Sequence, residues 1–115
     1  MEASISHISI IVKSEASVEF YSRLGFKEIR QINRTNDTVV LMEGNGMGLE
    51  IFVDPRHPDR ATEPENCGIR YFAIKVSDFD TINKEINCGS INTDWYGKRY
   101  CFTYDPDGLP IQLHE

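Results

Sequence analysis

Alternating apolar and polar residues predict strands over much of this chain. Residues 5–12 read ISHISIIV, with β-branched residues on one face and His7 and Ser9 on the other. Residues 48–54 read GLEIFVD and place Glu50 opposite another apolar stripe. Strands with this pattern bury one face and leave the polar face open, so both segments predict a half-buried sheet.

The alternation starts again in the second half of the chain. Residues 69–76 read IRYFAIKV, with Tyr71 on the polar side. The chain ends in a predicted hairpin around the turn 105–108, DPDG, in which Pro sets the first dihedral and Gly supplies a positive φ. Gln112 and His114 share the polar face of its last strand.

Two segments have apolar residues at helical spacing. The first follows Ser14, which can cap a helix, and reaches Gly25, which is placed to end it. The second follows Ser77 and reaches Gly89 in the same way. Each predicted helix comes directly after a predicted strand, so the sequence favours an α+β fold with mixed sheets.

The whole pattern is an internal repeat of strand–helix–strand–strand–strand. Residues 26–34 and 38–43 supply the middle strands of the first copy, and residues 90–96 predict a short strand in the second. We therefore predict one domain over residues 1–115, made of module one (1–54), a Pro-rich and charged linker (55–67) and module two (68–115).

The repeat places four polar-face residues at matching positions. His7 and Tyr71 are 64 positions apart, and Glu50 and Gln112 are 62 positions apart. If the two half-sheets curve toward each other, these four side chains meet in one concavity. Convergent polar groups in a concave site predict a small-molecule ligand.

Composition excludes several other partners. The net charge of −6 and the absence of a basic stripe argue against nucleic acid. No apolar run approaches the roughly 20 residues that span a bilayer, and the N-terminus has no signal-peptide core, so we expect no membrane partner and a cytoplasmic protein. The three cysteines are odd in number and lack CxxC spacing, which predicts reduced thiols and no zinc knuckle.

Four motifs in order resemble the vicinal oxygen chelate superfamily, which includes glyoxalase I, bleomycin-resistance proteins, fosfomycin-resistance enzymes and extradiol dioxygenases. They are ISHISIIV, SVEFYSRLGF at 17–26, IRYFAIKVSDFD at 69–80 and the ending YDPDGLPIQLHE. The resemblance covers the whole chain. It implies two βαβββ modules that form a curved mixed sheet around a central cup, with the helices on the outer face. It also implies a homodimer, since such cups are often completed between two copies.

In metal-dependent members of the superfamily, a side chain from the first and last strand of each module binds one divalent ion. Carried over by position, those ligands would be His7 and Glu50, then Tyr71 and Gln112. The first pair suits nickel, zinc or manganese. The second pair departs from the family's His and Glu, because a phenol is a poor ligand unless deprotonated and an amide cannot act as a base.

Two functions remain open on this basis. The incomplete ligand set favours a glyoxalase/bleomycin-resistance-like protein that binds a small molecule without the full metal set and needs no cofactor. Its ligand would contact Tyr71, Gln112, Trp95 and His114, although Trp95 could instead cover the core. The alternative is a metal-dependent lyase or isomerase similar to glyoxalase I, with His7 and Glu50 as ligands and Glu50 as the catalytic base. An iron dioxygenase is disfavoured, since Tyr71 removes its second His.

Overall fold

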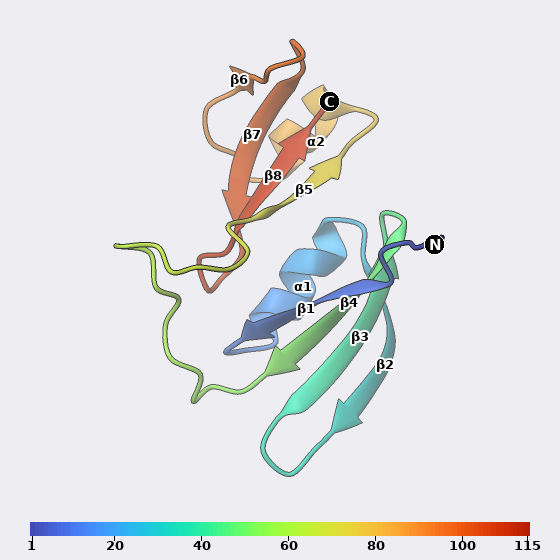
Figure 1. The fold of residues 1–115 in the computed structure, drawn as a ribbon, viewed down its shortest axis with the longest axis vertical. Coiled ribbons are helices and arrows are strands. Elements are labelled where there is room, and N and C mark those ends of the chain that lie inside the picture. The colour runs from blue at the N-terminus through green and yellow to red at the C-terminus, as the bar shows by residue number, and fades with distance from the viewer. The chain divides into compact units, whose positions relative to one another are not determined.

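The computed structural model describes residues 1–115, which form two compact units, Met1–Asp59 and Arg60–Glu115. Each unit has one helix and a four-stranded mixed sheet (Figure 1). The first unit contains β1 (His7–Val12), α1 (Ala16–Arg23), β2 (Lys27–Asn33), β3 (Thr38–Gly44) and β4 (Met47–Val53). The second contains β5 (Phe72–Lys75), α2 (Phe79–Glu85), β6 (Asn92–Thr93), β7 (Arg99–Tyr104) and β8 (Pro110–His114). The predicted α+β class is confirmed.

Both sheets have the same strand order, which confirms the internal repeat. The orders are β1-β4-β3-β2 and β5-β8-β7-β6, and in each sheet the first and last strands of the unit pair in parallel. Ser9 lies opposite Glu50 in one register, and Ala73 lies opposite Gln112 in the other. Glu50 and Gln112 therefore hold equivalent places. The grouping of both units into one domain stays a prediction.

The first unit is built around the apolar face that the alternation predicted. Leu49, Ile51 and Val53 of β4 are buried, as are Phe20 and Tyr21 of α1. Ser14 does not cap α1 directly. Its Oγ accepts from the amide of Ala16, while the N-cap position belongs to Glu15, which makes no side-chain cap bond. Gly25 follows the end of the helix with a φ of +98°, as its predicted role requires.

The strand predicted over 69–76 is shorter in the structure, and Pro110 explains why. In the first unit the amide of Gly48 donates to the carbonyl of Ser6, which ties down the chain just before β1. Pro110 occupies the equivalent place in the second unit and has no N–H to donate. β5 therefore begins at Phe72, and Tyr71 lies just outside the strand.

Two predictions about α2 are wrong. Asp78, not Ser77, is the N-cap, and its carboxylate accepts from the Thr81 amide at 3.1 Å. The helix ends because Ile86 turns to an extended conformation, without help from Gly89. The Gly89 amide instead donates to the carbonyl of Phe102 at 2.9 Å, so tertiary pairing with β7 determines its place.

The prediction of three reduced thiols is also wrong for two of them. Cys88 and Cys101 form a disulfide with 5.9 Å between their Cα atoms, while Cys67 is free and exposed. Cys101 is completely buried and lies on the face of β7 that is directed to the core. Local CxxC spacing could not reveal a pair that tertiary structure brings together. Neither helix is long and apolar enough to cross a membrane.

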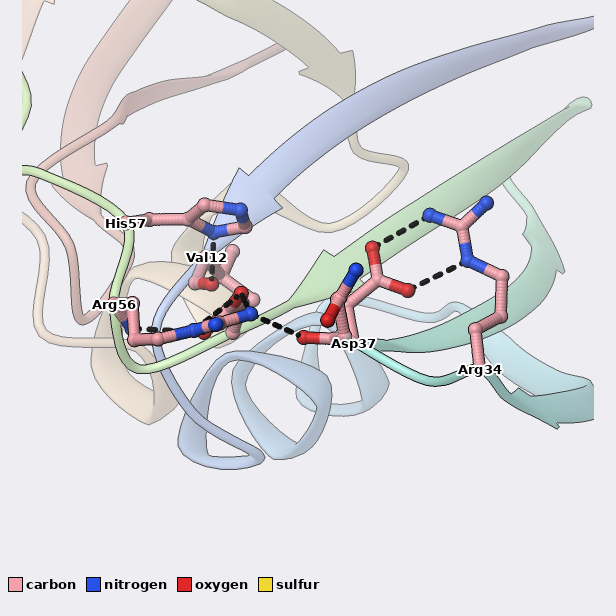
Figure 2. A network of polar contacts seen from close by, with 7 residues as sticks. Val12, Arg34, Asp37, Arg56 and His57 are labelled. Carbon is pink, nitrogen blue, oxygen red and sulfur yellow. Dashed lines mark hydrogen bonds and ion pairs between the residues drawn. The ribbon is translucent and has the colours of Figure 1, made fainter.

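The predicted linker is divided between the units. On the first unit, Arg56 binds both carboxylate oxygens of Asp54 and the carbonyl of Asn36, and His57 Nδ1 lies 3.0 Å from the carbonyl of Val12 (Figure 2). Lys13 and Asp59 form a further ion pair. The Arg56 guanidinium lowers the pKa of Asp54 to about 2. Residues 54–59 thus belong structurally to the first unit.

Residues 60–71, which we call the strap, are held on the second unit. Arg60 donates from Nη2 to the carbonyls of Ile69 and Arg70 at 3.2 and 3.1 Å. Arg70 pairs with Glu65 through two hydrogen bonds of 2.9 and 2.7 Å. The strap is therefore a folded loop with its own side-chain ties.

Candidate functional site

The open face of the first sheet brings His7 and Glu50 together. They stand on the neighbouring parallel strands β1 and β4, and His7 Nε2 lies 3.5 Å from Glu50 Oε2. Their side chains remain 44% and 32% exposed, so both groups can still reach a ligand. The structure thus brings His7 and Glu50 together on one polar face of the sheet, where the alternation in the sequence places them.

Two serines orient this pair. Ser9 Oγ donates to Glu50 Oε2 at 3.0 Å, and Ser6 Oγ lies 3.2 Å from His7 Nδ1. Ser9 fixes one carboxylate oxygen and leaves the other available, while Ser6 sits at the ring nitrogen that faces away from Glu50. The sequence analysis did not assign a role to either serine. In the sequence, only their positions next to His7, one residue before it and two residues after it, indicate such a role.

Gly48 makes room for His7. A Cβ built at this position would lie 3.0 Å from the Cβ of His7 and 3.2 Å from the carbonyl oxygen of Ser6. Real Cβ atoms rarely make contacts this short, so His7 or the backbone at Ser6 would have to shift. The small residue at the start of β4 is therefore part of the site.

A groove of about 730 Å³ surrounds the pair within the first unit. Besides His7 and Glu50 it has apolar walls from Ile29, Leu41 and Met47. Its volume falls within the range of about 300–1,000 Å³ typical of ligand pockets. Lys27 and Glu43 add further charged groups to its lining, so the groove combines apolar walls with a few polar groups, as a small-molecule site requires.

The open face of the second sheet is aromatic instead. Tyr71 packs edge-to-face on Phe102 with 4.9 Å between ring centroids. Gln112 lies opposite Phe102 in the β7–β8 register and is half-buried. His114 follows on the same strand face, with Nδ1 2.9 Å from the carbonyl oxygen of Glu115. Phe102 is a site residue that the sequence analysis missed, although its place two residues after Tyr100 on an alternating strand put it on this face.

Trp95 lies in the turn between β6 and β7. The Asp94 carboxylate accepts from the amides of Tyr96 and Lys98 at 2.8 and 2.9 Å, which fixes the turn. The Trp95 side chain is 98% exposed. It does not cover the core of its own unit, which excludes one of its two predicted roles; contact with a ligand stays a prediction.

The donor set fits only part of a divalent metal site. An imidazole and a carboxylate in contact, as at His7 and Glu50, are good ligands for nickel, zinc or manganese. No group of three or more His, Cys, Asp or Glu side chains is arranged to hold an ion. Tyr71 and Gln112 offer a phenol held against a ring and a neutral amide. The residues of the second unit do not complete the set.

Comparison with known proteins identifies the family and the fold. The sequence model of the Glyoxalase/Bleomycin resistance protein/Dioxygenase superfamily matches residues 4–113. YwkD of Bacillus subtilis is 35% identical over 97% of this chain and 96% of its own length, and YaeR of Escherichia coli is 35% identical over 96% and 95%. The crystal structure of a glyoxalase family protein from Enterococcus faecalis superposes with a TM-score of 0.88 at 34% identity, covering 97% of both chains.

Proposed function

The chain belongs to the glyoxalase/bleomycin resistance protein/dioxygenase superfamily, and we propose that it binds a small molecule without a full set of metal ligands. The observation that carries the proposal is the contrast between the two open faces. One has a groove with the contacting pair His7 and Glu50, and the other has aromatic and amide side chains at the equivalent positions. Such a set can recognise a ligand, but it supplies only two of the four metal ligands that the resemblance implies.

The first face supplies polar recognition. The Glu50 oxygen that Ser9 does not occupy can accept a hydrogen bond from a ligand hydroxyl or amine. His7 can donate or accept, depending on its tautomer. The apolar walls of the groove would bury the rest of the molecule, and exclusion of water would strengthen these polar contacts.

The second face supplies stacking. Tyr71 and Phe102 present ring surfaces, and the Gln112 amide can both donate and accept. We propose that the ligand also contacts Tyr71, Gln112, Trp95 and His114, in a homodimer. Sedimentation analysis tests the oligomeric state. We also propose that the protein is located in the cytoplasm. The Cys88–Cys101 disulfide argues against this location, because the cytoplasm is a reducing compartment.

Screening of small-molecule fragments by NMR tests this function. The protein is first treated with a chelator to remove metal ions, and binding is followed through changes in its amide chemical shifts. Binding fragments should shift the amides of residues 6–9 and 47–50, and also those near Tyr71 and Gln112. His7→Ala and Tyr71→Ala should each weaken the same fragments, and Arg23→Gln, an exposed change on α1, should not. Fragments that bind outside both faces, or bind equally well to His7→Ala, would contradict the proposal.

The 3.5 Å contact between His7 and Glu50 favours a second candidate, a divalent-metal-dependent lyase or isomerase similar to glyoxalase I. A bound ion would supply stabilisation of negative charge on the substrate oxygen. Glu50 is the carboxylate placed to accept a substrate proton, and Gln112 cannot replace it.

Thermal melting with nickel, zinc and manganese separates the two candidates. A metal held by His7 and Glu50 should stabilise the protein by about 2.7 kcal/mol at a hundredfold excess over Kd, and His7→Ala should remove that gain. Turnover of a hemithioacetal that Glu50→Gln abolishes would establish the enzyme. If no metal raises the melting temperature, the small-molecule binder remains.

A further inference from the structure

The second unit contains a pocket that its own residues form completely. The pocket has a volume of about 310 Å³, at the lower end of the range for ligand sites. One wall is the strap, residues 60–71, and the opposite wall is β7 with the turn that leads to β8. We call it the strap pocket. Neither His7 nor Glu50 is among the residues that line it.

Aromatic rings line the strap pocket. Tyr71 and Phe102 meet edge-to-face, and Tyr104, two residues along the same face of β7, is 60% exposed. Pro110 and Gly108 complete the apolar side. An edge-to-face pair beside a third exposed ring leaves flat surfaces on which another ring can pack, in the offset geometry that aromatic pairs prefer.

The strap wall is already ordered by its own contacts. Glu65 holds Arg70 in a two-bond pair, and Thr62 and Glu65 form a β-bridge across the loop. Arg60 binds the carbonyls of Ile69 and Arg70. Binding to a wall that is formed beforehand costs little conformational entropy.

One arginine gives the rim of the pocket a positive charge. Arg70 is neutralised by Glu65, whose pKa is lowered mainly by its hydrogen bonds with Arg70. Arg60 makes no ion pair of its own, although its charge also acts on Glu65, and only its Nη2 donates hydrogen bonds within the unit. In the neighbouring turn, Asp105 is buried and accepts from the amides of Asp107 and Leu109. Arg60 can therefore meet an anionic group with the donors that remain.

We propose that the strap pocket binds a small planar aromatic anion. The ring packs among Tyr71, Phe102 and Tyr104, and a carboxylate or phosphate meets the Arg60 guanidinium, for which charge-assisted hydrogen bonds are the strong ones. The proposal names a ligand class for the second face and to that extent rests on the proposed function. It needs neither His7 nor Glu50.

Calorimetric titration of the full chain with four probes tests the proposal. The probes are 2-naphthoate, 2-naphthyl phosphate, the neutral 2-naphthamide and the non-aromatic cyclohexanecarboxylate. We expect the two aromatic anions to bind at least tenfold more tightly than the other two. The tighter of the two aromatic anions then identifies the preferred head group. Equal binding of all four, or no binding of any, overturns the proposal.

Variants locate the charge. Arg60→Gln should weaken 2-naphthoate about tenfold and leave 2-naphthamide unchanged, whereas loosening of the strap would weaken both probes alike. Tyr104→Leu should weaken both. Arg30→Gln, an exposed arginine of the first unit, is the matched control and should change neither affinity.

His7→Ala separates this proposal from the proposed function. If His7→Ala leaves 2-naphthoate binding intact and Arg60→Gln reduces it, the strap pocket is the site. If His7→Ala abolishes binding and Arg60→Gln does not, the anion occupies the groove of the first unit. That result overturns the strap pocket and supports the proposed function.

Discussion

The two units share one topology and differ in the chemistry of their open faces. Their strand orders and registers match, so that Glu50 and Gln112, or Gly48 and Pro110, hold equivalent places. Gly48 leaves room for His7 and donates an amide that extends the pairing of β1, whereas Pro110 has no N–H to donate. The comparison teaches that a repeat can preserve the backbone geometry while single residues change the chemical groups that its open face presents.

The units are also stabilised in different ways. The core of the first includes Phe20, Tyr21 and Phe26, whose rings meet edge-to-face. The second has a seven-residue helix, a disulfide and an ion-pair cluster in which Arg99 binds both Asp80 and Glu115. Both units have ion pairs, so the difference is the covalent cross-link of the second unit, which the first unit lacks.

The largest expected effect comes from truncating the two equivalent core residues. Leu49 and Ile111 are 1% and 0% exposed in their own units. Leu49→Ala and Ile111→Ala should each lower the free energy of unfolding by about 2–5 kcal/mol, from lost burial and the cavity that remains. Urea denaturation measures both. A loss below about 1 kcal/mol in only one variant would show that the equivalence does not extend to the cores.

Removal of the disulfide should have the next largest effect. Cys88→Ser should lower the free energy of unfolding by about 3 kcal/mol, because a short closed loop restricts the unfolded chain. Denaturation of the wild type with and without a thiol reductant checks this. Cys67→Ser is the control and should behave as the wild type, since Cys67 is free and exposed.

A substitution at Gly48 should act on the site more than on stability. Gly48→Ala places a Cβ against His7, so we expect a loss of about tenfold in the affinity of the fragments or metals bound by that face. Pro110→Ala is the matched change in the other unit and should leave this affinity unchanged. Equal losses in both variants would mean that Gly48 has no special relation to His7.

Acid should weaken the contacts in Figure 2 in a defined window. Arg56 lowers the pKa of Asp54 from 3.8 to about 2 in the folded protein. A carboxyl with a lowered folded pKa stabilises the protein above its unfolded pKa, and this stabilisation is lost as the pH falls from about 4 to about 2. Melting temperatures recorded from pH 5 to pH 2 should fall less steeply for Asp54→Asn than for the wild type. Parallel curves would count against a role for the pair.

Trp95→Ala should have the smallest effect. The side chain is 98% exposed, so its removal should change the free energy of unfolding by less than about 0.5 kcal/mol. Because Trp95 is the single tryptophan, its exposure can also be measured in the wild type by fluorescence. The emission maximum should be that of an indole in water. A blue-shifted emission or a large loss of stability would show that Trp95 is buried in the protein in solution.

Alternation was sufficient to predict the strands and their faces, because the face of β4 depends mainly on which side chains must leave water. It also placed His7 and Glu50 on one side. It could not predict the length of β5, the cap at Asp78 or the Cys88–Cys101 pair. Each of these depends on a partner elsewhere in the chain or on competition between adjacent residues.

The candidate site could be predicted in outline only. His7 and Glu50 were found through their alternation and their matching places in the repeat. Ser9, Gly48 and Phe102 were missed, because their roles are defined by a neighbouring strand. Residues 60–67 of the strap were predicted as part of a surface linker, since Pro and charged residues are typical of such connections. The Arg70–Glu65 pair is visible only once the chain is folded.

The division of the connecting segment between Asp59 and Arg60 has a practical consequence. The part of the segment before this bond is attached to the first unit through contacts of Asp54, Arg56, His57 and Asp59. The part that begins at Arg60 belongs to the second unit. The coding sequence could therefore be split at this bond into two fragments for separate expression. Each fragment would carry its own anchored end, without a loose tail at the cut.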